Sequence, residues 1–120
     1  MKSFVQPAII IVQAALILCM ESSLVSAQEI RDGNWEGTGQ IVSGSGQGGG
    51  VELALMVRGS RVQFISGPDA NQTVSLERGK APTQNGDWAF EQCGDNLENL
   101  CVTFEQNQPD RIIRYLLHSN

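Results

Sequence analysis

Apolar residues recur at every second position through most of the chain after residue 28, and this alternation limits the possible folds more than any other feature of the sequence. It is clearest in Val51–Val57, where all four odd-numbered positions carry Val or Leu. A period of two is typical of a half-buried β-strand, whereas an amphipathic helix needs a period near 3.6. The sequence therefore predicts an all-β domain.

Several segments carry this pattern, and a turn signal separates them about every 8–12 residues. Such spacing indicates an antiparallel meander of six to eight strands, closed as a small barrel or folded as a flattened sandwich. Closure into a barrel would also leave few free strand edges. Seven segments are expected to form strands, namely 35–42, 51–57, 61–65, 72–77, 88–93, 100–105 and 111–117.

Two stretches between these segments are expected to be loops. Residues 43–50 consist almost entirely of Gly and Ser, and glycine loses too much backbone entropy in regular structure. Residues 79–87 combine glycines with Pro82 and Asn85, which favour turns. The inward phase of the strands predicts a core of Trp35, Leu53, Leu55, Val62, Phe64, Val74, Leu76, Trp88, Phe90, Val102, Phe104 and one phase of 112–117.

The first 27 residues have the three parts of a cleavable secretory signal peptide. Lys2 supplies the positive start, an apolar run extends over residues 4–20, and Val25 and Ala27 occupy the −3 and −1 positions of a small-residue cleavage site. We therefore expect a single domain over residues 28–120 that is secreted or periplasmic.

Two other interpretations of this leader remain open. An uncleaved membrane anchor would need about 20 apolar residues, and the run is shorter and interrupted. A bacterial lipoprotein would carry its lipid on Cys19, but the preceding Leu18 is larger than that motif requires. We expect no stable membrane anchor after cleavage.

Cys93 and Cys101 remain when the leader is removed, and an even number of cysteines in an exported domain favours a disulfide. Each lies in the polar phase of its predicted strand, so both sulfur atoms are expected on the same side of the sheet. A redox pair would have the shorter thioredoxin-type spacing, and a metal site would need more ligands nearby. We expect a structural disulfide across one hairpin.

The composition argues against several functions. The formal net charge is −5 without a basic cluster, which makes nucleic acid and anionic membranes poor partners. Residues 44–50 lack the helix and Lys of a phosphate-binding loop, and residues 95–99 lack the spacing of a calcium loop. The single histidine, His118, lies near the C-terminus, where chains fray. We expect no catalytic residue, metal site or cofactor, and therefore a protein that is not an enzyme.

Gly33-Asn34-Trp35 opens the first predicted strand, and Arg111 and Arg114 lie on the last. This arrangement resembles that of lipocalins, and more loosely that of avidin-like barrels, whose first strand carries a Gly-x-Trp segment. The resemblance implies that Trp35 closes the base of a barrel with Arg114 over its ring as a cation–π contact. In size and architecture the domain is also similar to small periplasmic inhibitor proteins, which block proteases or lysozymes through a loop or the N-terminal segment.

Two functions follow from this fold. We favour an interaction or inhibitor module with a filled core, which contacts an exported or cell-envelope protein through residues 28–33, 43–50 or 79–87. The alternative is a carrier for a small apolar ligand. An eight-stranded barrel is only just wide enough for side chains or one small ligand, so a cavity of about 300 Å³ or more, open at one end, would favour the carrier. Its candidate binding residues are Trp35, Trp88, Phe90, Arg114 and Tyr115.

Overall fold

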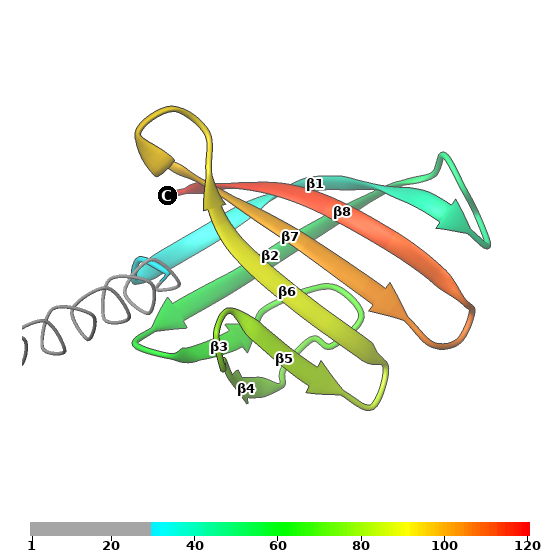
Figure 1. The fold of residues 1–120 in the computed structure, drawn as a ribbon, viewed down its shortest axis with the longest axis horizontal. Coiled ribbons are helices and arrows are strands. Elements are labelled where there is room, and N and C mark those ends of the chain that lie inside the picture. Colours follow the sequence, from blue (N-terminus) through cyan, green and yellow to red (C-terminus); the bar gives the residue numbers. More distant parts are fainter. Residues whose placement is uncertain (1–29) are drawn as a thin grey trace, which may run out of the picture.

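The computed structural model describes residues 30–120, so the predicted signal peptide, residues 1–27, lies outside the described part of the chain. Eight strands form one antiparallel sheet in the order β4-β3-β2-β1-β8-β7-β6-β5 (Figure 1). Among residues 30–120, no helix is long and apolar enough to cross a membrane. The elements are β1 Gly33–Gly44, β2 Gly50–Arg58, β3 Arg61–Phe64, β4 Thr73–Ser75, β5 Lys80–Thr83, β6 Gly86–Cys93, the 3₁₀ turn η2 Asp95–Leu97, β7 Asn99–Gln106 and β8 Arg111–Ser119.

The first and last strands pair with each other, which curls the meander into a nearly closed barrel. β1 pairs with β2 on one side and with β8 on the other, where Trp35 lies opposite Ser119. The alternating strand directions place the β1–β2, β5–β6 and β7–β8 connections at one end, here called the mouth (Figure 1). The opposite end, here called the base, carries the β2–β3, β4–β5 and β6–β7 connections. The predicted all-β fold is confirmed, and the chain forms a nearly closed barrel rather than a sandwich.

The prediction of a loop over residues 79–87 was wrong, because Lys80–Thr83 is the short strand β5. This strand raises the number of strands from the predicted seven to eight. Pro82 lies within it, opposite Asp87, and proline is tolerated in a sheet mainly at an edge, where no ladder hydrogen bond is lost. β5 lies at the end of the strand order, which explains why a proline is compatible with it.

Two glycines in the inward phase of β1 allow β8 to approach closely. A Cβ atom at Gly37 would collide with the Leu116 carbonyl oxygen, and one at Gly39 would collide with the Arg114 carbonyl oxygen and with the ring of Tyr115. Any larger residue would push these two strands apart. The β1–β8 pairing that joins the two halves of the sheet therefore depends on glycine at both positions.

The inward phase of the strands fills the barrel with side chains, as predicted. The Trp88 ring stacks on Phe104 with 4.0 Å between centroids and contacts Phe64 at 4.5 Å. Val74 and Leu76 are only partly buried, since β4 is short and lies at the other end of the strand order. The core consists of Ile30, Trp35, Ile41, Leu53, Leu55, Val57, Val62, Phe64, Trp88, Phe90, Leu100, Val102, Phe104, Ile113, Tyr115 and Leu117.

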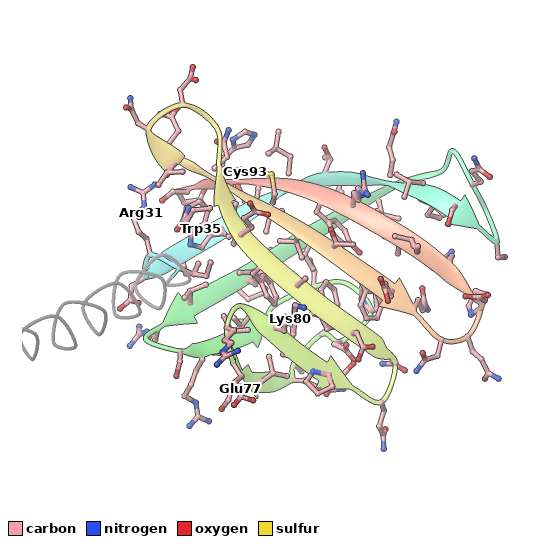
Figure 2. The ribbon with its side chains drawn as sticks, viewed as in Figure 1. Arg31, Trp35, Glu77, Lys80 and Cys93 are labelled. Atoms are coloured by element: carbon pink, nitrogen blue, oxygen red, sulfur yellow. A yellow bond between two sulfur atoms is a disulfide. The ribbon has the colours of Figure 1, made fainter. Side chains whose placement is uncertain are left out.

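The base is closed by the segment that precedes β1. The Trp35 indole Nε1 donates to the Arg31 carbonyl at 3.2 Å, and the Arg31 guanidinium lies 6.0 Å from the Trp35 ring centroid (Figure 2). Arg31 also reaches the Leu97 carbonyl, 2.6 Å away. Trp35 therefore lies at the base as predicted, but the cation over its ring is Arg31 and not Arg114. Arg114 belongs to the outward phase of β8 and is exposed.

The predicted disulfide is present. Cys93 and Cys101 are bonded, with their Cα atoms 6.0 Å apart, on the outer face of β6 and β7 (Figure 2). They are diagonal neighbours, because Cys93 lies opposite Asn99 and Cys101 lies opposite Glu91. The bridge therefore fastens this hairpin next to the base connection between the two strands.

The seam between β4 and β5 is closed by a buried carboxylate. A single isolated bridge, Glu77 with Lys80, joins the chain just after β4 to the start of β5 near the base (Figure 2). Farther toward the mouth, the loop over residues 65–72 fills the gap and carries Asp69, which is 1% exposed. One Asp69 oxygen accepts hydrogen bonds from Trp88 Nε1 at 2.7 Å and from the Thr83 hydroxyl at 2.8 Å. Its other oxygen accepts from Asn85 Nδ2 at 2.6 Å and from Gln72 Nε2 at 3.4 Å.

We predict that Asp69→Asn lowers the free energy of unfolding by about 2 kcal/mol, because an amide nitrogen replaces one acceptor and leaves buried donors unpaired. Urea denaturation followed by tryptophan fluorescence measures the loss. Asp87→Asn is the control, since Asp87 is exposed on β6, and it should change stability by no more than about 0.5 kcal/mol. Equal effects of the two substitutions would contradict the role of Asp69.

We also predict that replacing both Cys93 and Cys101 with Ser lowers the free energy of unfolding by about 2.5 kcal/mol, the loop-closure entropy of a bridge this short. Denaturation of the wild-type protein with and without a reductant provides the same comparison. The reductant should have no effect on the double variant. A loss below about 0.5 kcal/mol would mean that the bridge adds little to this hairpin.

Candidate functional site

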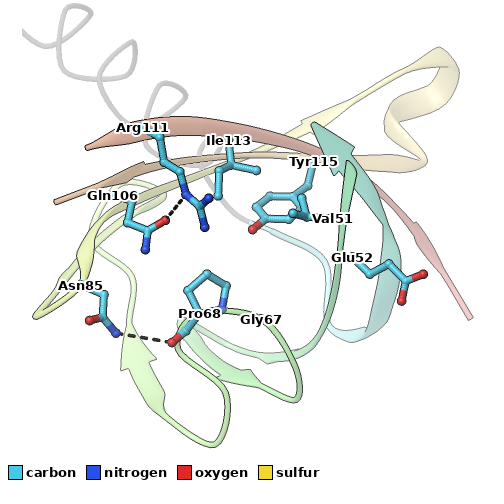
Figure 3. A pocket seen from close by; sticks show the side chains of 9 residues that line it. All are labelled: Val51, Glu52, Gly67, Pro68, Asn85, Gln106, Arg111, Ile113 and Tyr115. Carbon is cyan, nitrogen blue, oxygen red and sulfur yellow. Dashed lines mark hydrogen bonds between the residues drawn. The ribbon is translucent and has the colours of Figure 1, made fainter. Parts of the chain in front are cut away.

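A cavity of about 420 Å³ opens at the mouth of the barrel (Figure 3). Its walls come from three strands, β2, β7 and β8, and from the β3–β4 and β5–β6 connections, so segments far apart in the sequence form it together. We call it the mouth cavity. It is lined by Val51, Glu52, Gly67, Pro68, Asn85, Gln106, Arg111, Ile113 and Tyr115.

The period of the strands explains why the upper wall has this composition. Arg111, Ile113 and Tyr115 follow one another in the inward phase of β8, of which Leu117 is the next member toward the base. Gln106 ends the inward phase of β7 and lies opposite Arg111. Val51 begins the inward phase of β2. Each strand thus presents its last inward side chains to the cavity, where the packed core ends.

The lower wall depends on the buried carboxylate of Asp69. Pro68 precedes Asp69 in the loop over residues 65–72, and Asn85 lies in the β5–β6 turn. The Asn85 side chain donates to Asp69 and also to the Pro68 carbonyl, 3.4 Å away (Figure 3). The same carboxylate that closes the barrel seam therefore also fixes the position of this wall.

Arg111 is the cation of the mouth cavity. Its Nε atom donates to Gln106 Oε1 at 2.7 Å, and this is the one hydrogen bond of its guanidinium within residues 30–120. Gln106 is held in turn, because its Nε2 atom donates to the Gln108 carbonyl at 3.2 Å. The guanidinium points into the cavity (Figure 3).

Tyr115 also projects into the mouth cavity, from the inward position of β8 that follows Ile113 (Figure 3). Its ring lies against β1, where Gly39 leaves room for it. The residue is 3% exposed, and its hydroxyl has no hydrogen-bond partner in the described part of the chain. Burial raises the pKa of Tyr115 to about 12, and the positive charge of Arg111 opposes part of that increase. The phenol is therefore neutral and remains a donor at physiological pH.

The structure separates the candidate binding residues chosen from the sequence. Trp35, Trp88 and Phe90 are at most 5% exposed and pack within the core, so they do not line an open interior. Arg114 lies outside the barrel. Only Tyr115 lines the mouth cavity. Arg111 was not chosen as a binding residue from the sequence. Its position in phase with the apolar residues of the last strand does, however, predict a charge that faces the interior.

A second cavity, of about 630 Å³, lies beside the free edge of β6, where β5 ends. Its walls include Ile30, Lys80, Phe90 and Leu97. The amide of Gln92 is already occupied there, because it accepts from the Arg31 backbone and donates to the carbonyls of Leu97 and Asn99. Because the polar side chain of this groove is already paired, the mouth cavity is the better candidate for a ligand site.

Metal binding finds no support in residues 30–120, where no three His, Cys, Asp or Glu side chains gather closely enough to hold an ion. The exposed His118 ring lies 3.1 Å from Asn99 Oδ1 on the outside of β8. Comparisons of the chain with protein families, curated proteins and solved structures found no match.

Tyr115 is the single tyrosine of the chain, so its ionisation can be followed directly by tyrosinate absorbance. We predict a midpoint near pH 12 in the folded protein and near pH 10 in urea. Because folding raises this pKa, the associated stability is complete below pH 10 and is lost as the pH rises from 10 to 12. A folded-state midpoint near 10 would show that the hydroxyl is hydrated rather than buried.

Proposed function

We propose that this protein binds a small molecule in the mouth cavity. The observation that carries the proposal is the cavity itself, which measures about 420 Å³ and opens at one end of the barrel. Ligand sites in proteins commonly span about 300–1,000 Å³ and combine apolar walls with a few oriented polar groups. Val51, Pro68 and Ile113 supply the apolar surface, and Arg111 and Tyr115 supply the polar groups.

The filled core limits the size and the position of such a ligand. Trp88 and Phe104 stack at 4.0 Å and block the lumen beneath Tyr115, whose ring centroid lies 6.1 Å from that of Trp88. A long lipid chain would have no channel to enter. The proposed ligand is therefore small and lies at the mouth. A fully apolar ligand would instead need space deep in the barrel, which the core side chains fill.

Binding without catalysis fits the chemistry of the cavity walls. General acid–base catalysis works best with a group whose pKa lies near the working pH. The pKa of Tyr115 is about 12, and arginine stays protonated throughout the physiological range. Neither group exchanges a proton readily at neutral pH, so they favour holding a ligand over transforming it.

Export and a lipocalin-like barrel are further parts of this proposal. The leader over residues 1–27 supports secretion or a periplasmic location, and the Cys93–Cys101 disulfide suits an oxidising compartment. Trp35 at the base of the barrel supports the likeness to lipocalins. A binding protein for a small molecule outside the cytoplasm is consistent with both.

A role as an interaction or inhibitor module is the second candidate, and the groove beside β6 supports it. Ile30 and Lys80 both line this groove, and they belong to the segments 28–33 and 79–87 that the sequence suggested as contact surfaces. Leu97 is 57% exposed beside them and would be covered by a protein partner.

Native mass spectrometry of the oxidised protein, purified from its own host, tests the first candidate. We predict a discrete small-molecule adduct that is lost on collisional activation. Val51→Trp should abolish the adduct because the indole would occupy the mouth cavity. Thr38→Trp is the matched control, since Thr38 is exposed on the outer face of β1 opposite Glu52 and does not line the cavity, and it should retain the adduct.

A bare mass for the wild-type protein, or an adduct that persists in Val51→Trp, would overturn the proposal. A stable complex with a second protein, retained in both variants, would favour the interaction module instead.

A further inference from the structure

We infer that the mouth cavity recognises a small amphiphile with a singly charged anionic head group, best matched by a carboxylate. Arg111 and Tyr115 would hold the head group, and the apolar wall would hold a short tail. This inference rests on the proposed binding function and names its ligand class.

The Arg111 guanidinium is oriented for an anion. Gln106 engages its Nε atom at 2.7 Å, which fixes the plane of the group and leaves both terminal nitrogens without a partner in the described residues. A guanidinium presents its N–H groups as a rigid fork that matches the two oxygens of a carboxylate. Arg111 is partly buried, and an anion in the cavity would supply the counter-charge that its guanidinium lacks among the described residues.

The Tyr115 hydroxyl gives a second, independent reason to expect a ligand oxygen in the mouth cavity. Buried hydroxyl groups almost always have a hydrogen-bond partner, and this one has none within residues 30–120 although the residue is only 3% exposed. Because the phenol is neutral, its proton is available to an acceptor in the mouth cavity. A ligand oxygen near Arg111 would fill that place.

The acidic residues at the mouth end leave the Arg111 guanidinium without a hydrogen-bonded carboxylate in the described residues. Asp87, Glu105 and Asp110 are exposed and do not line the cavity. The Glu52 carboxylate points away from the cavity (Figure 3). The Asp69 carboxylate is buried behind Pro68, and its oxygens accept hydrogen bonds from Trp88, Thr83 and Asn85. The mouth cavity is therefore a positive site on a chain whose net charge is −5.

The number and kind of the groups narrow the ligand further. One guanidinium balances one negative charge, whereas a doubly charged phosphate would need more donors than this cavity offers. Val51, Pro68 and Ile113 form the remaining wall and favour an apolar continuation of the ligand. The cavity lies near the lower end of the usual range of ligand sites, so the tail is short.

Calorimetric titration of the full protein with hexanoate and with hexanol at neutral pH tests the inference. The two probes share an alkyl chain and differ in the charged head group. We expect hexanoate to bind at least about tenfold more tightly. Arg111→Gln should reduce hexanoate affinity to that of hexanol, and retained hexanol binding would show that the variant is folded. Tyr115→Phe should weaken hexanoate binding by about fivefold to tenfold.

Arg114→Gln is the matched control, because it removes the same charge from the outer face of the same strand, and it should leave both affinities unchanged. If hexanol binds as tightly as hexanoate, or if Arg114→Gln weakens hexanoate binding as much as Arg111→Gln, the inferred recognition of an anionic head group is wrong. The proposal that the mouth cavity binds a small molecule would be unaffected. If neither probe binds, the inferred ligand class is overturned, and the adduct measurement on the purified protein decides the binding function separately.

Discussion

The buried carboxylate of Asp69 is the interaction on which most of this structure depends. An unpaired charge inside a small domain would be prohibitively unfavourable, and here four side-chain donors surround it. They come from the core of β6, from the end of β5, from the β5–β6 turn and from the loop of Asp69 itself. The carboxylate thereby replaces the ladder of hydrogen bonds that β4 and β5 are too short to form with each other.

The same contacts connect the core to the mouth cavity. Trp88 Nε1 donates to Asp69 while its ring stacks on Phe104, so the loop that closes the seam sets the orientation of one of the two core tryptophans. Asn85 donates to Asp69 and to Pro68, which places the lower wall of the cavity. Seam closure, core packing and the shape of the candidate site are therefore coupled through one side chain. A change in any of them would alter the other two.

The local period of the chain was sufficient to predict much of this fold and little of its site. Alternation identified the inward phases and the core, and the phase of Cys93 and Cys101 predicted their pairing. Strand β5 was not predicted because its four residues, which include Pro82, are too few to show an alternation of apolar and polar positions. They form a strand only through their pairing with β6. The burial of Asp69 depends on hydrogen-bond partners 14–19 residues away in sequence. The local sequence around Asp69 therefore predicts a turn but not a buried carboxylate. Arg31 lies before the first strand and reaches Trp35 only once the base has formed.

Net charge and local charge have opposite signs at the mouth cavity, and this contrast constrains what can bind there. At a distance the chain presents a net charge of −5 and repels anions, although physiological salt screens that field beyond about 8 Å. Only a ligand that already touches the mouth meets the fork of Arg111 and the Tyr115 hydroxyl. Under the proposed function, capture of an anion would therefore depend on direct contact and not on long-range electrostatic steering. Free inorganic anions gain nothing from Val51, Pro68 and Ile113, whereas an amphiphile gains from the apolar wall and the charged fork together. If the mouth cavity binds a ligand as proposed, the combination of a repulsive surface with an attractive, half-apolar mouth would select for the second kind.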